Sequence, residues 1–336
     1  MPLDLTSLAA IQTLAPTLPV IDETSRGAAR DRQAQLTKPP GSLGVLEDVA
    51  VFMAGWQATE RPTIDRAQAL VFAGNHGICD QGVNPFPQAV TAQMVANFEA
   101  GGAAINQLCR ANGADLTVVP LELDRPTQDF TRGPAMTEVE TLAALNIGAA
   151  AVDPDADILL LGEMGIGNST IAAALACASF GGAPDDWVGR GTGSDDAGMA
   201  LKAKVIGDGL ARMGPVAPIM ALAALGGREQ AAICGAVLAA RAARVPVLLD
   251  GYISTAAIAP LAATDITLLD HCLMGHKSAE PGHARLLQAM EKKPLLDFDM
   301  RLGEGTGAAL ALGIVRSALA CHNGMATFAE AGVADG

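Results

Sequence analysis

The chain has 336 residues, half of them hydrophobic but only 3% aromatic, so small aliphatic side chains must fill its core. This length suffices for one large α/β domain or for two domains. The formal net charge of −14 argues against nucleic acid or an anionic membrane as a partner, because both bind basic surfaces.

Neither a signal peptide nor a membrane span is predicted. The N-terminus has no basic start followed by an apolar stretch. Residues 164–184 form an uncharged run long enough to cross a bilayer, but its glycines and the polar run 168–170 favour a buried helix. The six cysteines are scattered singly, which favours reduced thiols in a cytoplasmic enzyme over disulfides or a zinc site.

In chain order, the first 60 residues are polar and helical in pattern, and Ser42 is a suitable N-cap for a helix starting near Leu43. Four apolar runs that predict strands follow, at 69–73, 116–120, 157–161 and 245–249. Three of them lead into Gly-rich turns, at 74–77, 162–165 and 250–252. A last apolar helix follows Gly307, with no obvious strand after it.

Continuous apolar runs predict strands that are buried on both faces, as in a parallel sheet covered by helices. The repeated order of strand, turn and helix predicts an α/β fold with a doubly wound, mainly parallel open sheet, which is Rossmann-like. We expect residues 60–284 to form a large substrate-binding domain. Residues 1–59 and 285–336 are expected to form a smaller, mainly helical domain, from which the loop around Glu304 returns to the active site.

Glu304 lies in the run Arg-Leu-Gly-Glu-Gly-Thr-Gly, at residues 301–307, directly before the last helix. Glycines let a ligand approach the backbone closely, and a carboxylate held on such a loop can accept a proton from a substrate. We therefore interpret Glu304 as a general base. A solvated loop glutamate is the alternative that the segment leaves open.

The turn at residues 162–170 resembles a phosphate-binding turn, because glycines follow a strand and hydroxyl residues open a helix. It has neither the Gly-Lys-Ser/Thr of a Walker A loop nor a GxGxxG pattern. The polar residues 168–170 can instead simply cap the helix. Glu163 would disfavour an anion beside it, unless it contacts another group such as a sugar hydroxyl.

A third Gly-rich loop, at residues 189–196, precedes a helix that carries Lys202 and Lys204. Lys202 can supply the positive charge that a phosphate needs, although a surface lysine is the simpler alternative for both.

Three histidines, at 271, 276 and 283, invite a metal site, but their spacing and the Pro-Gly break at 281–282 argue against one. Ser278 is a better candidate, as a phosphate donor. His76 can be catalytic or structural.

Together these segments resemble one family, the nicotinate-nucleotide–dimethylbenzimidazole phosphoribosyltransferases of cobalamin lower-ligand assembly. The matching segments run in the family's order over nearly the whole chain, at residues 38–44, 75–77, 162–170, 250–252, 276–283 and 301–307. The resemblance implies transfer of ribose 5-phosphate from nicotinate mononucleotide to 5,6-dimethylbenzimidazole. The products would be α-ribazole 5′-phosphate and nicotinate.

The resemblance also assigns roles to residues. Glu304 would remove the benzimidazole N–H, and Glu163 matches a glutamate of the substrate site. The phosphate contacts fall on Gly191, Lys202 and Ser278, with the Gly165 turn nearby, and Leu302 and Phe86 would line the benzimidazole pocket.

The family implies a homodimer and neither a metal nor a redox cofactor. Many relatives carry Asp where this chain has Asn75, and we expect that position to be structural. Two other functions stay open, a nucleotide phosphohydrolase in which Glu304 activates water and a nucleotide-binding sensor without turnover.

Overall fold

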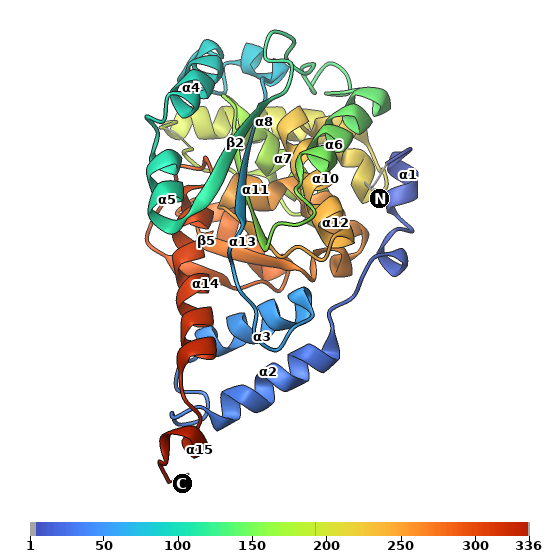
Figure 1. Ribbon diagram of the computed structural model, residues 1–336. Helices are drawn as coiled ribbons and strands as arrows, with labels where there is room; N and C mark the ends of the chain where they lie inside the picture. Colours follow the sequence, from blue (N-terminus) through green and yellow to red (C-terminus); the bar gives the residue numbers. More distant parts are fainter. Residues whose placement is uncertain (1–4, 192, 335–336) are drawn as a thin grey trace.

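A computed structural model describes residues 5–191 and 193–334 of the chain. Its centre is one sheet of six parallel strands in the order β2-β1-β3-β4-β5-β6 (Figure 1). The strands are β1 (Ala67–Ala73), β2 (Ala114–Pro120), β3 (Ile158–Met164), β4 (Val247–Leu249), β5 (Cys272–Lys277) and β6 (Pro294–Asp297). This is the expected α/β fold, and the order of strands reverses at β1, between β2 and β3.

Helices cover both faces of the sheet. They are α1 (Leu8–Ile11), α2 (Glu23–Gln35), α3 (Val45–Gln57), α4 (Ala89–Glu99), α5 (Ala104–Asn112), α6 (Glu138–Ala151), α7 (Asn168–Phe180), α8 (Asp196–Met213), α9 (Ala221–Leu225), α10 (Arg228–Ala242), α11 (Tyr252–Ala257), α12 (Ala259–Thr264), α13 (Pro281–Ala289), α14 (Thr306–Gly324) and α15 (Phe328–Ala331). Short 3-10 helices join them: η1 (Ala15–Thr17), η2 (Gly77–Gln81), η3 (Pro184–Asp186), η4 (Pro218–Met220) and η5 (Ile266–Leu269).

Two hydrophobic clusters sandwich the sheet, because successive side chains of a strand point to opposite faces. Leu159 and Leu161 of β3 pack with α6, α7, α10 and α11, whereas Leu160, between them, packs with α3, α5 and α14. All three leucines are fully buried. The two-sided burial explains why three of the apolar runs predicted β1, β3 and β4 correctly. The fourth run falls in β2, although this strand lies at the edge of the sheet and has no buried residue.

The sequence did not predict β5 and β6. Strand β5 includes Gly275, His276 and Lys277, and β6 begins at Pro294 on the outer edge of the sheet. An edge strand tolerates proline because one side of its backbone has no ladder to form. The segment 285–336 therefore contributes a strand to the main sheet as well as helices.

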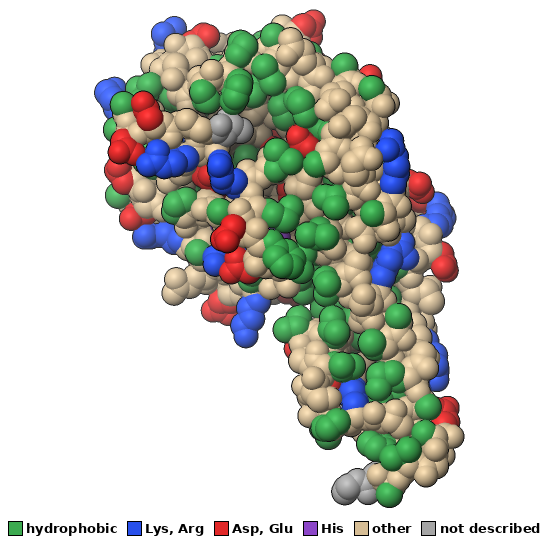
Figure 2. All heavy atoms as spheres, turned by 90° about the vertical axis from the view of Figure 1, so that its left-hand side faces the viewer, with side chains coloured by type: hydrophobic (Ala, Val, Ile, Leu, Met, Phe, Trp, Pro, Cys, Tyr) green, Lys and Arg blue, Asp and Glu red, His purple; other side chains and the backbone are tan. Residues whose placement is uncertain are grey.

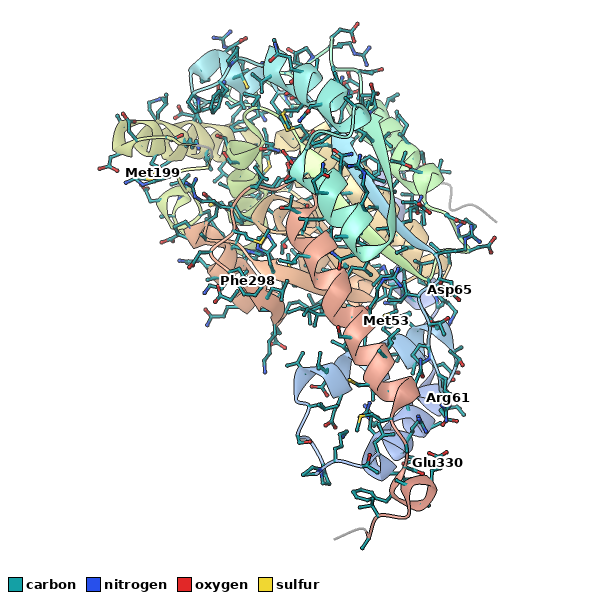
Figure 3. All side chains as sticks on the ribbon, turned by 60° about the vertical axis from the view of Figure 1, so that its left-hand side comes forward. Met53, Arg61, Asp65, Met199, Phe298 and Glu330 are labelled. Atoms are coloured by element: carbon teal, nitrogen blue, oxygen red, sulfur yellow. The ribbon has the colours of Figure 1, made fainter. Side chains whose placement is uncertain are left out.

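Helices from the two end segments of the chain, α2, α3 and α15, lie around the C-terminal half of α14 at the lower end of the molecule, whereas α1 lies apart from them, beside the main body (Figure 1). Arg32 Nε of α2 donates to the carbonyl of His322, at 2.8 Å, and Leu36 forms an antiparallel bridge with Thr327. Met53 of α3 lies beside α14 (Figure 3). Residues 1–4 and 335–336 of the expected smaller domain lie outside the described residues.

Contacts also link that expected domain to the larger one. The N–H of Leu8 donates to Glu138 Oε1 of α6, at 3.0 Å, and α14 lies directly on the sheet. The division into a 60–284 domain and a smaller domain from both ends thus stays a prediction.

Ser42 was expected to cap α3, and this prediction is wrong. The N-cap is Gly44, whose φ of 55° lies in the left-handed region, and it makes no side-chain cap bond. Glu47 Oε1 instead reaches back to the N–H of Leu43, at 3.0 Å. Across the described part of the chain, no helix is both long and apolar enough to cross a bilayer.

Candidate active site

One pocket opens at the carboxyl ends of β3, β4 and β5, where ligands of doubly wound sheets bind. Its space measures about 850 Å³, including the open mouth. Every residue that the sequence assigned to a substrate or to chemistry lines it, namely Phe86, Glu163, Gly165, Gly191, Lys202, Ser278, Leu302 and Glu304. Figure 2 looks onto a face of the molecule that is hollowed between hydrophobic and basic side chains.

Glu304 sits in a turn of unusual backbone shape at the start of α14. Gly303, Glu304 and Gly305 have φ values of 85°, 65° and 87°. Gly305 packs so closely on β3 that a Cβ atom on Gly162 would lie 2.4 Å from the nitrogen of Gly305. The two glycines allow this path, and Glu304 follows it at a conformational cost.

Asp250 anchors the turn from the end of β4. Its carboxylate accepts hydrogen bonds from the backbone N–H groups of Gly305 (3.1 Å), Gly307 (2.6 Å) and Ala308 (3.1 Å). These are N–H groups that the first turn of a helix cannot satisfy internally. The side chain of Asp250 is fully buried, so it fixes the loop that carries Glu304 to the sheet.

The pocket favours neutral carboxyl groups. Burial, and then the negative charge of Asp250, raise the pKa of Glu304 to about 7. Burial raises the pKa of Glu163 well above its usual value, and the charges of Asp250, Glu229 and Glu304 add to the effect. Near neutral pH, Glu304 can thus accept a proton readily, and the neutral form of Glu163 is favoured more than in an exposed glutamate. This property of Glu304 suits a general base better than a solvated loop residue.

The other end of the pocket is suited to an anion. Lys202 is buried, and its Nζ donates to Ser169 Oγ and to the carbonyl of Gly189, both at 3.3 Å. A Cβ atom on Gly191 would lie 3.3 Å from the same Nζ, so the backbone of this loop reaches the ammonium closely. Lys202 is therefore not a surface lysine, whereas Lys204 is exposed and pairs with Asp208.

The turn at residues 162–170 leads from β3 into α7. The N-cap of α7 is Gly167, with a φ of 91°, and no side chain caps the helix. The capping alternative for residues 168–170 is thus wrong. Asn168 donates instead to Glu163, and Ser169 faces Lys202.

Apolar side chains flank the mouth of the pocket. Phe86 and Leu302 are 46% and 54% exposed, unusually high values for large hydrophobic residues. Exposed apolar surface beside a cavity commonly marks a binding site. Such a rim can accept the flat, apolar face of an aromatic ring.

Two of the three clustered histidines are part of the core. His271 and His283 are buried, and burial lowers the pKa of each to about 3. His283 Nδ1 accepts from the N–H of Ser278, at 2.8 Å, which orients a pocket residue. No cluster of three or more potential metal ligands occurs among the described residues.

His76 does not line the pocket. It is fully buried and pairs with Glu229 Oε1 at 2.7 Å, directly behind the Gly165 turn. Asn75 Nδ2 donates to the carbonyl of Leu123, at 2.8 Å, across the loops at the ends of β1 and β2. Both contacts are structural, which agrees with the structural alternative for His76.

Sequence reasoning missed several residues that line the pocket: Asp250, His276, Glu280 and Arg301. Asp250 could have been found, since a polar residue directly after a buried strand lies at the ligand edge of the sheet. Burial opposes the charged form of His276, but the hydrogen bond and charge of Asp250 outweigh this and raise the pKa of His276. No local signal marks Glu280.

Comparisons with known proteins agree with this geometry. A sequence model described as phosphoribosyltransferase matches residues 18–333. The chain is 67% identical to the nicotinate-nucleotide–dimethylbenzimidazole phosphoribosyltransferase of Rhodobacter capsulatus, over 98% of this chain and 99% of that one. It is 59% identical to the enzyme of the same name from Ruegeria pomeroyi, over 99% of both chains.

A solved structure has the same fold. The crystal structure of CobT from Thermus thermophilus superposes with a TM-score of 0.87 at 40% identity, covering 93% of this chain and all of the other. Fold, sequence and full-length coverage therefore agree, and the chain belongs to the family of nicotinate-nucleotide–dimethylbenzimidazole phosphoribosyltransferases.

Proposed function

We propose that this pocket transfers ribose 5-phosphate from nicotinate mononucleotide to 5,6-dimethylbenzimidazole, in the assembly of the cobalamin lower ligand, with Glu304 as general base. The observation that carries the assignment of the base is a buried carboxylate with a pKa of about 7, placed on a fixed loop beside an apolar rim. Family membership supports the choice of substrates.

In the reaction, one ring nitrogen of the benzimidazole attacks the anomeric carbon of the ribose. The bond from that carbon to the pyridine nitrogen breaks, and nicotinate leaves with the electron pair. The N–H proton of the benzimidazole passes to Glu304, so that charge balances. Attack from the face opposite to nicotinate inverts the anomeric carbon and gives α-ribazole 5′-phosphate.

Each end of the pocket binds a different part of the substrates. Lys202, Ser278 and the N–H of Gly191 hold the phosphate, with the Gly165 turn nearby. Phe86 and Leu302 hold the ring of the base. Glu163 lines the same pocket, and its carboxyl group can hydrogen-bond to an oxygen of the ribose. Holding both substrates in one orientation contributes much of the rate, since it replaces a bimolecular encounter.

The test separates transfer from its alternatives. The protein is incubated with nicotinate mononucleotide, with and without 5,6-dimethylbenzimidazole, and nicotinate and the new glycoside are quantified. Equal yields of both products, only when the base is present, are expected. Release of inorganic phosphate would indicate a phosphohydrolase, nicotinate release without the base would indicate hydrolysis of the glycosidic bond by water, and unchanged nucleotide in both reactions would indicate a sensor.

A variant tests the role of the carboxylate. Glu304→Gln keeps the size of the side chain and removes the proton acceptor, so kcat should fall by up to roughly 10³-fold while nucleotide binding persists. Normal turnover by this variant would exclude Glu304 as the base.

We also propose that the protein is a cytoplasmic homodimer that requires no metal or redox cofactor and binds no nucleic acid. The family resemblance supports the dimer, as do the hydrophobic side chains gathered on the face in Figure 2. The net charge of −14 argues against nucleic acid. Sedimentation velocity at micromolar concentration should give twice the chain mass, and a monomer would contradict the proposal.

A further inference from the structure

Glu280 holds the groups to which the phosphate is assigned. Its Oε1 accepts a hydrogen bond from the N–H of Gly191, at 2.9 Å, and its own N–H donates to Ser278 Oγ, at 3.3 Å. The residue directly precedes α13 and is 8% exposed. An acidic side chain thus lies inside the end of the pocket that is suited to an anion.

The surroundings of Glu280 are tightly built. A Cβ atom on Gly189 would lie 1.9 Å from Glu280 Oε2, so only glycine fits beside this oxygen. Arg301 Nη1 donates to the carbonyl of Gly191, at 3.0 Å, and holds the same loop from the other side. The arrangement of loop and carboxylate is therefore specific rather than a chance surface contact.

The charge of Glu280 is costly in this place. Burial raises the pKa of its carboxyl, although the hydrogen bond from Gly191 and the charges of Lys202 and Arg301 counteract the effect. A phosphate placed on Lys202 and Gly191 would bring a second anion against the first. Like charges brought together in a partly buried site repel strongly.

We propose that Glu280 competes with the phosphate of the nucleotide for the N–H of Gly191 and thereby weakens the binding of every phosphate-bearing ligand. This inference rests on the proposed function, since it takes the phosphate to bind at Gly191, Lys202 and Ser278. Because the substrate and the product both carry the phosphate, the competition lowers the affinity for both. Glu280 in this way prevents tight retention of the product.

Two variants separate competition from a merely structural role. Glu280→Gln keeps an oxygen that can accept from Gly191 but removes the charge, and Glu280→Ala removes both. If Glu280 competes, both variants bind nicotinate mononucleotide more tightly, with Kd about fivefold or more below that of the unaltered protein. If Glu280 only supports the loop, the Gln variant is unchanged and the Ala variant binds more weakly, which would overturn the proposal.

The measurement is isothermal titration calorimetry with nicotinate mononucleotide, inorganic phosphate and nicotinate riboside, which lacks the phosphate. Competition predicts tighter binding of the first two ligands and no change for the third. Glu99→Gln, which removes one exposed surface charge, serves as the matched control and should alter none of them. An equal gain for the riboside would also refute the inference.

Binding and catalysis are read separately. If 5,6-dimethylbenzimidazole proved not to be the acceptor, the transfer assay would fail while the comparison of phosphate binding would still stand. If the transfer assay succeeds and the Kd values do not move, only the role of Glu280 is wrong.

Discussion

The pKa of Glu304 makes a quantitative prediction about the dependence of the reaction on pH. The carboxylate form is needed to accept the proton, so activity is lost as pH falls through the pKa of about 7. With that value, roughly a tenth of the base is ionised at pH 6 and about nine tenths at pH 8, so kcat/KM should rise about tenfold. A glutamate with an ordinary pKa would be almost fully ionised at both values of pH, and the rate would hardly change.

The assay is the initial rate of glycoside formation between pH 5 and 9, at constant ionic strength. The phosphate of the nucleotide titrates near pH 6, so the profile is repeated with nicotinate riboside, which lacks it, and each rate is corrected for the fraction of the benzimidazole that is protonated at that pH. Asp250→Asn removes the charge that helps to raise the pKa of Glu304, so the midpoint should move to lower pH. A flat profile, or a midpoint below pH 6, would refute the assignment of Glu304 as a buried base.

Three further substitutions probe the site and the core. Lys202→Ala should raise KM for nicotinate mononucleotide and affect the riboside much less, and equal losses on both would show that Lys202 does not bind the phosphate. Leu312→Ala, on the fully buried face of α14, should lower the free energy of unfolding by about 2–5 kcal/mol in urea titrations, whereas Val333→Ala on the surface should change it little. Gly307→Ala would place a Cβ atom 1.8 Å from the His276 ring and should destabilise by about 1–3 kcal/mol, and an unchanged melting temperature would contradict this packing.

Burial determined how much of the fold could be predicted. A strand buried on both faces must be apolar throughout, and β1, β3 and β4 are largely so, which is why their positions followed from the residues alone. The edge strand β2 was found from a short apolar run, although none of its residues is buried. Strand β6 lies at the edge and begins with Pro294, and β5 carries the polar residues His276 and Lys277 at the end that faces the pocket. Neither strand therefore has a continuous apolar run: in β5 the polar residues face the pocket, and in β6 the edge position admits a proline.

In the active site, features that depend on neighbouring residues in the sequence could be predicted, and features that depend on distant residues could not. Glycine-rich runs placed Glu304 and Lys202 near the pocket because close approach of backbone and ligand restricts the sequence locally. The anchoring of the Glu304 loop could not be predicted, since Asp250 and Gly305 are 55 positions apart in the sequence and meet only across the sheet. The pairing of His76 with Glu229 also depends on two segments that are distant in the chain.

The backbone of Glu304 has a consequence for the engineering of this protein. Its φ of 65° is natural for glycine, and a side chain there costs about 1–2 kcal/mol. Glu304→Gly should therefore raise the melting temperature while it abolishes turnover, a trade between robustness and activity. A library selected only for heat resistance would discard the carboxylate that we propose as the general base, so thermostabilisation of this enzyme has to be screened with the reaction running.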